Sequence, residues 1–366
     1  MPSNRIGHLA GNLELYLCEL DAGINAPKGN FLDVWYHSCT PCNAQLDRML
    51  QRVLHVGPAW LLAPISFITS LLPGGGAHRI GQNTYTDRDV HNLFDRFPAH
   101  LKFIPNEERK GEDSLRAMGV PAGAPFVCLV IRDAAYLADQ ATRSHAKPDL
   151  SSHDYRNCNI QNYILAAQEL VKRGYYVVRM GAVVREAMNV SHPMIIDYAA
   201  NGMRSDFMDI YLGAKCAFCI SNGTGFDGVP YIFRRPNVYV DMVPIGFSFT
   251  FGSNFLATTK KHWLRRENRF MTFREIFESG AAYFYRTSEY DRMAIDLIES
   301  TPEEAAAVIL EMESRLQGTW QTTEEDEELQ RRFWEIFDKR PGSQAHGEIR
   351  LRVGTDFLRQ HKAWLE

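Results

Sequence analysis

The stretch that decides the fold spans residues 205–241 and reads SDFMDIYLGAKCAFCISNGTGFDGVPYIFRRPNVYVD. It begins with a capped helix predicted over 206–212, which leads into an apolar strand predicted over 216–221. A turn of small residues follows, then a short apolar segment that ends at Phe233, and a second strand is predicted over 238–240. The order strand, turn, helix, strand is the repeating unit of a doubly wound α/β domain.

The small-residue turn in this unit is a candidate phosphate-binding site. It lies where the C-terminal end of a strand meets the N-terminus of a helix, and free backbone N–H groups and the helix dipole favour an anion there. A turn of this composition is also often a plain tight turn, and the sequence leaves both interpretations open. The residues of the candidate site are Ser221, Asn222, Gly223, Thr224 and Gly225.

Further strands and helices continue the α/β pattern around this stretch. Strands predicted over 126–131 and 175–179 flank an amphipathic helix predicted over 159–173, which is typical of a parallel sheet. From Thr301 onward the chain is predicted to be helical, because a capping threonine, a proline and two glutamates start a helix there. The charged and then Pro- and Gly-rich segment 105–125 is the predicted linker between two domains.

Length and composition are those of a soluble globular protein. The 366 residues allow two domains or one large one, and 45% hydrophobic and 23% charged residues are normal for a chain with a sizeable core. The formal net charge of -4 offers no basic excess for a nucleic-acid backbone, so we expect no nucleic-acid partner. Seven cysteines, an odd count, and no recognisable secretory signal predict free thiols and a cytoplasmic location.

One apolar stretch, residues 56–73, approaches the length of a membrane-spanning helix and reads VGPAWLLAPISFITSLLP. Pro58, Pro64 and three hydroxyl side chains interrupt it, and no positive flank anchors it. We therefore expect either a buried helix or a helix that lies on a surface, with peripheral contact at the inner membrane rather than a span.

Arginines follow the predicted strands at the edge where open α/β sheets place their ligands. Arg132 comes directly after the strand over 126–131, Arg156 lies just before a helix, and Arg179 ends the next strand. Arginine suits bidentate capture of phosphate, although each of these arginines could instead pair with a nearby aspartate. Together with the turn, the candidate donor-binding residues are Arg132, Asp133, Arg156, Asn157, Arg179, Gly181 and Asp206.

A glycine-bearing loop near the N-terminus offers candidates for a general base. His8 lies between Gly7 and Gly11 at the start of a predicted helix, and histidine titrates near neutral pH. Glu14 is a second candidate further along the same helix. The alternative is that His8 only caps the helix.

Two pairs of cysteines share the spacing Cys-x-x-Cys. Cys39 and Cys42 follow a predicted strand and precede a helix, as the dithiol of a thioredoxin does. Cys216 and Cys219 lie within a predicted strand, where residues three apart face opposite sides, so we do not expect a zinc site there. No Asp-x-Asp motif stands in a context suited to a divalent ion, and we assign no metal.

Taken together, the chain resembles a family of bacterial glycosyltransferases from surface-polysaccharide gene clusters. The matching segments are RIGHLAGNLELYL, HDYRNCNIQNYILAAQELVKRGYYVVRMG, SDFMDIYLGAKCAFCISNGTGFDGVP and TPEEAAAVILEMESRLQGTW with LQRRFWEIF. The resemblance implies two Rossmann-like domains across a cleft, the GT-B arrangement, with C-terminal helices. Residues 1–115 would form the acceptor domain, residues 116–300 the domain that binds a nucleotide sugar, and residues 301–366 a helical segment.

The resemblance also implies a reaction. A sugar would move from a nucleotide-sugar donor to a surface or capsular glycan, free or lipid-linked, with no metal and no other cofactor. Arg132, Arg156 and the turn at Thr224 would stabilise the leaving nucleotide. His8 or Glu14 would take the proton of the acceptor hydroxyl. Two alternatives stay open: a nucleotide-sugar epimerase or hydrolase on the same fold, and a thioredoxin-like redox protein that uses the dithiol.

Overall fold

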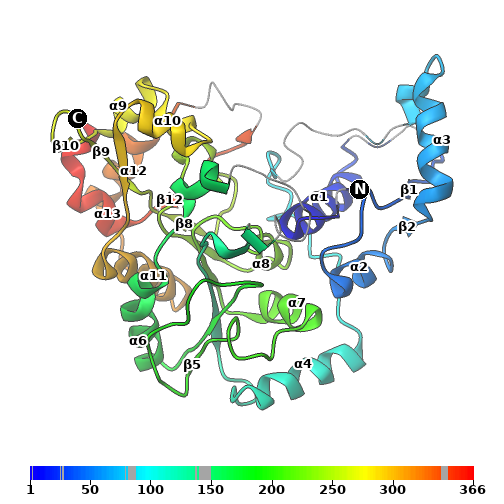
Figure 1. The fold of residues 1–366 in the computed structure, drawn as a ribbon, viewed down its shortest axis with the longest axis horizontal. Helices are drawn as coiled ribbons and strands as arrows, with labels where there is room; N and C mark the ends of the chain where they lie inside the picture. The colour runs from blue at the N-terminus through cyan, green and yellow to red at the C-terminus, as the bar shows by residue number, and fades with distance from the viewer. Residues whose placement is uncertain are drawn as a thin grey trace.

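A seven-stranded parallel sheet forms the centre of the molecule (Figure 1). The computed structural model describes residues 1–366 apart from positions 2, 25, 27, 28, 79, 81–87, 137, 140–149 and 339–344. The strand order is β12-β8-β7-β6-β3-β4-β5, and every neighbouring pair is parallel. The strands are β3 (Phe126–Val130), β4 (Tyr176–Arg179), β5 (Ile195–Ile196), β6 (Cys219–Ser221), β7 (Asn237–Tyr239), β8 (Phe255–Ala257) and β12 (Arg352–Val353).

Both faces of the sheet are covered, because successive side chains of a strand point to opposite faces. Val127 and Leu129 of β3 share one core with helices α6 (Ile164–Lys172) and α11 (Pro302–Leu316). Cys128 and Val130 of the same strand face a second core, which is covered by α7 (Asp206–Lys215). This continuous burial of β3 is what a central parallel strand requires.

The chain winds away from the middle of the sheet in two directions. After β3 it passes to β4 and β5 on one side, and after β6 it continues to β7 and β8 on the other. The strand order therefore reverses between β3 and β6, and open α/β sheets bind their ligands at such a switch point. The expected α/β class, with a doubly wound parallel sheet and C-terminal helices, is confirmed.

The N-terminal part packs onto this sheet through helices. Helix α1 contacts α8 (Gly228–Ile232), and α2 contacts α7. Among the described residues this part contains a two-stranded parallel sheet, smaller than the Rossmann-like sheet expected over 1–115. Its elements are α1 (Ile6–Asp21), β1 (Val34–Trp35), α2 (Ala44–Leu50), β2 (His55–Val56), α3 (Ala59–Leu71), η1 (Gly75–His78) and α4 (Pro105–Ala117).

Helix α4 (Pro105–Ala117) occupies most of the segment 105–125 that was expected to be a linker, so this part of it is a helix and not an irregular connection. Pro105 starts the helix, and the Glu107 carboxylate accepts a hydrogen bond from the Ile104 N–H at 3.0 Å. The charged residues that suggested a linker lie on a helix that contacts α7.

The C-terminal segment is part of the sheet layer rather than an appendage, because α11 packs on α6 and β12 pairs with β8. A three-stranded antiparallel sheet in the order β10-β9-β11 lies beside it. The remaining elements are η2 (Leu150–Arg156), η3 (Ile160–Tyr163), η4 (Ile245–Phe247), β9 (Lys261–Leu264), β10 (Arg269–Phe270), α9 (Phe273–Glu278), η5 (Ala281–Tyr283), α10 (Thr287–Arg292), β11 (Ile295–Ile298), α12 (Glu324–Ile336), α13 (Thr355–Gln360) and η7 (Lys362–Leu365).

Candidate functional site: an arginine cluster at the switch point

One asparagine ties three segments together at the switch point. Asn222 follows β6, and its Oδ1 accepts a hydrogen bond from the Arg132 N–H at 2.9 Å, just beyond β3. Its Nδ2 donates to the Arg156 carbonyl at 2.9 Å, at the end of η2. Arg132 and Arg156, which the sequence placed at the same edge of the sheet, are thus brought together by Asn222.

The two guanidinium groups raise the positive potential of this edge without being neutralised. Burial, and then the charges of Arg156 and Arg5, lower the pKa of Arg132 to about 10. Burial, and then the charges of Arg132, Arg156 and Arg5, also lower the pKa of His153. The charge of Asp154 acts to raise the pKa of Arg132, but among the described residues Asp154 accepts a hydrogen bond from Asn157 and forms no ion pair with these arginines.

Several polar atoms at this edge have no hydrogen-bond partner in the described part of the chain. They are the Nε atoms of Arg132 and Arg156 and the Oγ1 of Thr224, all of them buried. The Nη2 of Arg156 donates to the Gly223 carbonyl, which fixes its guanidinium beside the turn. Buried donors of this kind are expected to have partners. A multiply charged anion with several oxygens, such as a phosphate, would supply them.

The backbone N–H groups of the turn are hydrogen-bonded within the turn itself. Ser221 Oγ accepts hydrogen bonds from the N–H groups of Gly223 at 3.1 Å and Thr224 at 3.3 Å, and it donates to Asp227 at 2.7 Å. These two N–H groups are therefore not free, contrary to the expectation that they would receive a phosphate. The helix that follows, α8, has only five residues and begins at Gly228, so its dipole is weak.

Helix α1 supplies the helix N-terminus instead. A Cβ on Gly7 would lie 2.8 Å from the Gly225 carbonyl oxygen, so the first turn of α1 sits directly against the turn at the switch point. Arg5, the N-cap residue, makes no side-chain capping bond, and the first turn of α1 carries no acidic residue. Arg5 was missed as a site residue; the glycine at position 7, which permits the close approach, was the available signal.

Of the two candidate bases, only His8 lies near the site. It is half-buried in the first turn of α1, close to Gly7. Glu14 is completely buried, and its Oε1 accepts hydrogen bonds from Arg234 at 2.7 Å and from the His100 ring at 3.1 Å. Hydrogen bonds with Cys18 and then Glu14 raise the pKa of His100 to about 10. Glu14 is thus a structural ion-pair partner, and its candidacy as a base is wrong.

Four of the other candidate donor residues are engaged in holding the fold together. Arg179 is 1% exposed and pairs with Asp197 at 3.2 Å. Asp133 accepts hydrogen bonds from the backbone N–H groups of Ala135 and Arg185, both at 2.8 Å. The Asp206 carboxylate accepts from the Ala44 N–H at 2.8 Å, which fixes α2 to α7, and a Cβ on Gly181 would collide with Val184. The carboxylates of Asp133 and Asp206 are thus taken up by backbone N–H groups, most of them from distant parts of the chain.

Asn157 stays at the edge of the cluster. Its Nδ2 donates to Asp154 at 2.8 Å, its carbonyl accepts from Lys260 at 2.5 Å, and its buried Oδ1 has no partner among the described residues. Lys260 and Asn222 therefore bind the carbonyls of two consecutive residues, Asn157 and Arg156.

Two groups of side chains in the described ranges have the spacing of metal ligands: Glu14, Cys18 and His100, and Cys158, Asp241 and Glu299. In the first group, Arg234 Nη2 lies 2.7 Å from Glu14 Oε1 and 3.4 Å from Cys18 Sγ, so a guanidinium occupies the centre. In the second, Lys260 Nζ lies 3.9 Å from Glu299 Oε1. Each group already has a fixed cation, and neither lends itself to holding a metal.

The dithiol residues differ in their surroundings. Cys39 is exposed, and hydrogen bonds led by the one from Ser3 lower the pKa of its thiol. Burial raises the pKa of Cys42 to about 11. Ser3 contacts both residues: its hydroxyl donates to the Cys39 carbonyl at 2.5 Å, and its carbonyl accepts a hydrogen bond from the Cys42 N–H at 2.8 Å.

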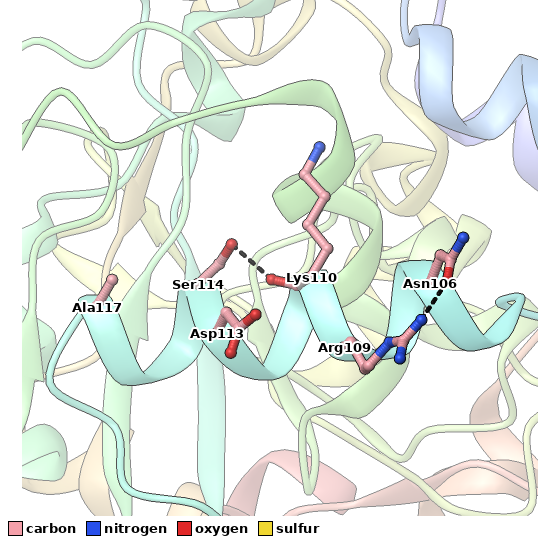
Figure 2. A pocket seen from close by; sticks show the side chains of 6 residues that line it. All are labelled: Asn106, Arg109, Lys110, Asp113, Ser114 and Ala117. Carbon is pink, nitrogen blue, oxygen red and sulfur yellow. Dashed lines mark hydrogen bonds between the residues drawn. The ribbon is translucent and has the colours of Figure 1, made fainter.

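A hollow of about 580 Å³ lies beside α4. Figure 2 shows the side chains that line it, which are those of Asn106, Arg109, Lys110, Asp113, Ser114 and Ala117. All six residues come from one helix. Arg109 donates to Asn106, and the Ser114 hydroxyl donates to the Lys110 carbonyl at 2.8 Å (Figure 2). Because no second element contributes, this hollow is a surface depression without the convergent groups of a binding site.

No known family model matches the sequence, and no curated protein is significantly similar to it. Among solved structures, the ADP-heptose LPS heptosyltransferase II of E. coli is 12% identical with a TM-score of 0.41, over 70% of this chain and 88% of that one. The MnaA–UDP co-structure of S. aureus is 9% identical with a TM-score of 0.21, over 84% of this chain and 79% of that one. Likenesses this distant say nothing about the site.

Proposed function

We propose that the chain is a glycosyltransferase that binds the phosphates of a nucleotide sugar between Arg132, Arg156 and the N-terminus of α1. The observation that carries this proposal is the pair of adjacent guanidinium groups without acidic partners at the switch point of a doubly wound sheet. Keeping like charges together and partly desolvated is unfavourable unless an anion binds between them. The sequence resemblance to bacterial glycosyltransferases supports the choice of a nucleotide sugar as that anion.

In such a reaction the bond between the sugar's anomeric carbon and the phosphate oxygen breaks, and negative charge grows on the nucleotide. Arg132, Arg156 and Arg5 stabilise that charge, and the uncapped N–H groups of α1 add to their effect. Guanidinium groups can do this without a divalent cation, so the proposed reaction is metal-independent. His8 takes the proton of the attacking acceptor hydroxyl.

The acceptor in this proposal is a surface or capsular glycan, free or lipid-linked, and the N-terminal part of the chain contacts it. The protein works in the cytoplasm and at the inner membrane. Of the described residues, none belongs to a helix that is both long and apolar enough to cross a bilayer.

A thermal-shift screen against nucleoside diphosphates and nucleotide sugars tests donor binding, because a ligand that binds the folded state raises the melting temperature. The best ligand should then lose roughly 1.5–3 kcal/mol of binding free energy in Arg156→Ala, measured by calorimetry, since a charge-assisted hydrogen bond is lost. Arg109→Ala on α4 is the matched control and should keep wild-type affinity.

If a folded Arg156→Ala variant binds the nucleotide as tightly as the wild type does, the phosphates do not bind at this site. Release of free sugar or of an epimerised donor in the absence of any acceptor would replace the transferase proposal with a hydrolase or epimerase that uses the same anion site.

A further inference from the structure

Helix α3 presents bulky apolar side chains to the outside of the molecule. None of its 13 residues is buried. Trp60 is 78% exposed, Phe67 66% and Leu71 68%, and Leu61, Ile65 and Ile68 are also exposed. In Figure 1 the helix stands at the far edge of the N-terminal part, away from the central sheet. Soluble proteins rarely leave so much contiguous apolar surface in water.

The outward position of these side chains follows from helix geometry. At about 100° per residue, the six exposed side chains fall on one broad face together with Pro64. The half-buried residues Leu62, Ala63, Ser66 and Thr69 fall on the opposite face. A helix that packs on its own core has its large apolar residues inside, and α3 reverses that pattern.

The surroundings of α3 indicate what covers this face. Residues 53–78 contain no Asp, Glu, Lys or Arg. On the opposite face, Leu62 and Val34 of β1 both lie within 4 Å of where a Cβ on Gly57 would be, so this side of α3 faces the protein. A protein partner would be expected to meet a polar, partly charged rim. A convex, uncharged and broad apolar surface is complementary to the hydrocarbon of a lipid bilayer.

The length of α3 determines how it would insert. Thirteen residues span about 20 Å at about 1.5 Å per residue, whereas the hydrocarbon core is about 30 Å thick. We propose that α3 lies in the plane of a lipid bilayer, with its outward face inserted at the boundary between headgroups and acyl chains, and holds the protein at the membrane surface. This proposal rests on α3 alone and is independent of the proposed sugar transfer.

Flotation with phosphatidylcholine vesicles tests the insertion. We expect the wild-type protein to float with the vesicles and to remain bound in about 0.5 M salt (a screening length of about 4 Å), because no charge takes part. Phe67→Ser combined with Leu71→Ser should lower the partition coefficient by about tenfold or more, since two apolar side chains leave the lipid. Both residues are exposed, so the fold should persist. Leu316→Ser, an exposed leucine on α11, is the matched control and should bind as the wild type does.

Fluorescence gives a second readout that does not depend on the serine variants. Lipids brominated near the headgroup should quench one of the six tryptophans, and Trp60→Phe should abolish that quenching. The proposal is overturned if the wild-type protein stays out of the vesicle fraction, or if about 0.5 M salt releases it (a screening length of about 4 Å). It is also overturned if the protein sediments as a dimer that the double serine variant dissociates, since a second copy would then cover α3.

Discussion

At the scale of the residue, the candidate site depends on arginines that lack acidic partners. A buried cation without a partner lowers stability, and functional sites are where proteins retain such groups. Arg132→Met keeps much of the side-chain volume and removes the charge. We expect its melting temperature to equal or exceed that of the wild type while the stabilisation by a bound nucleotide disappears.

Arg179→Met is the control for this prediction, because it removes an arginine that is 1% exposed and paired with Asp197. It should lose roughly 3–5 kcal/mol of unfolding free energy, the range for breaking a buried ion pair. Thermal unfolding with and without nucleotide measures both variants. An Arg132→Met protein as unstable as Arg179→Met would show that Arg132 has a structural role.

His8 and Glu14, which both belong to α1, are predicted to behave differently from each other. His8→Ala should lower turnover by about 10²–10⁴-fold, the usual contribution of a general base, with nucleotide affinity nearly unchanged. Glu14→Gln should instead lower the free energy of unfolding, because it removes the buried counter-ion of the half-buried Arg234. Full turnover in His8→Ala would place the base elsewhere.

At the scale of the element, the site requires α1 to lie directly on the turn after β6. Replacing Gly7 by alanine would gain up to about 1 kcal/mol of helix propensity. The new Cβ, however, would lie 2.8 Å from the Gly225 carbonyl oxygen, which is a backbone atom that cannot turn away. Overpacking of this kind costs about 1–3 kcal/mol, so the clash outweighs the gain.

Gly7→Ala should therefore lower both the melting temperature and the nucleotide affinity, because the displaced helix carries Arg5 away from Arg132. Gly76→Ala is the control, since a Cβ at that position meets no atom within 4 Å. Binding calorimetry and thermal unfolding of both variants decide the matter, and a stabilised Gly7→Ala protein would contradict the close docking of α1.

At the scale of the whole molecule, stability should fall on acidification. Glu107 joins α4 to Arg52 and α2, and its hydrogen bonds with Arg52 hold the pKa of its carboxyl at about 2. Burial acts to raise the pKa of Glu304, but the neighbouring His361 ring at 3.8 Å and hydrogen bonds from Lys261 bring it to about 2. Carboxyls with a lowered pKa stabilise the fold above their unfolded value near 4.5, and this contribution is lost as the pH falls from there to about 2.

Asp241 has the opposite effect. Burial raises the pKa of its carboxyl to about 6, so its contribution to stability weakens as the pH rises from about 4 to 6.

Glu107→Gln should lower the free energy of unfolding by about 1–2 kcal/mol at pH 7, a figure kept small because solvent reaches Arg52. The difference between variant and wild type should shrink as the pH falls from about 4.5 to 3. Urea unfolding at several pH values measures it. Glu335→Gln, an exposed residue on α12, should show no such dependence.

The sequence by itself determined the elements and the edge of the sheet where the arginines meet. Apolar runs such as 126–131, bounded by turns and alternating with amphipathic helices, specify parallel strands buried on both faces. Arg132 directly follows one of these strands, and the carboxyl ends of parallel strands share one edge. That is local information, carried by neighbours in the chain.

Only the tertiary structure decided which polar groups remain available. Glu14 is bound by Arg234, 220 positions away, and the N–H groups of the turn are bound by Ser221. Arg5 reaches the cluster because α1 docks on Gly225. Such pairings depend on how helices pack on the finished sheet, and no periodicity or spacing in the sequence encodes them. A buried polar group takes whichever partner packing brings within hydrogen-bond distance, so its role is settled only when the chain has folded.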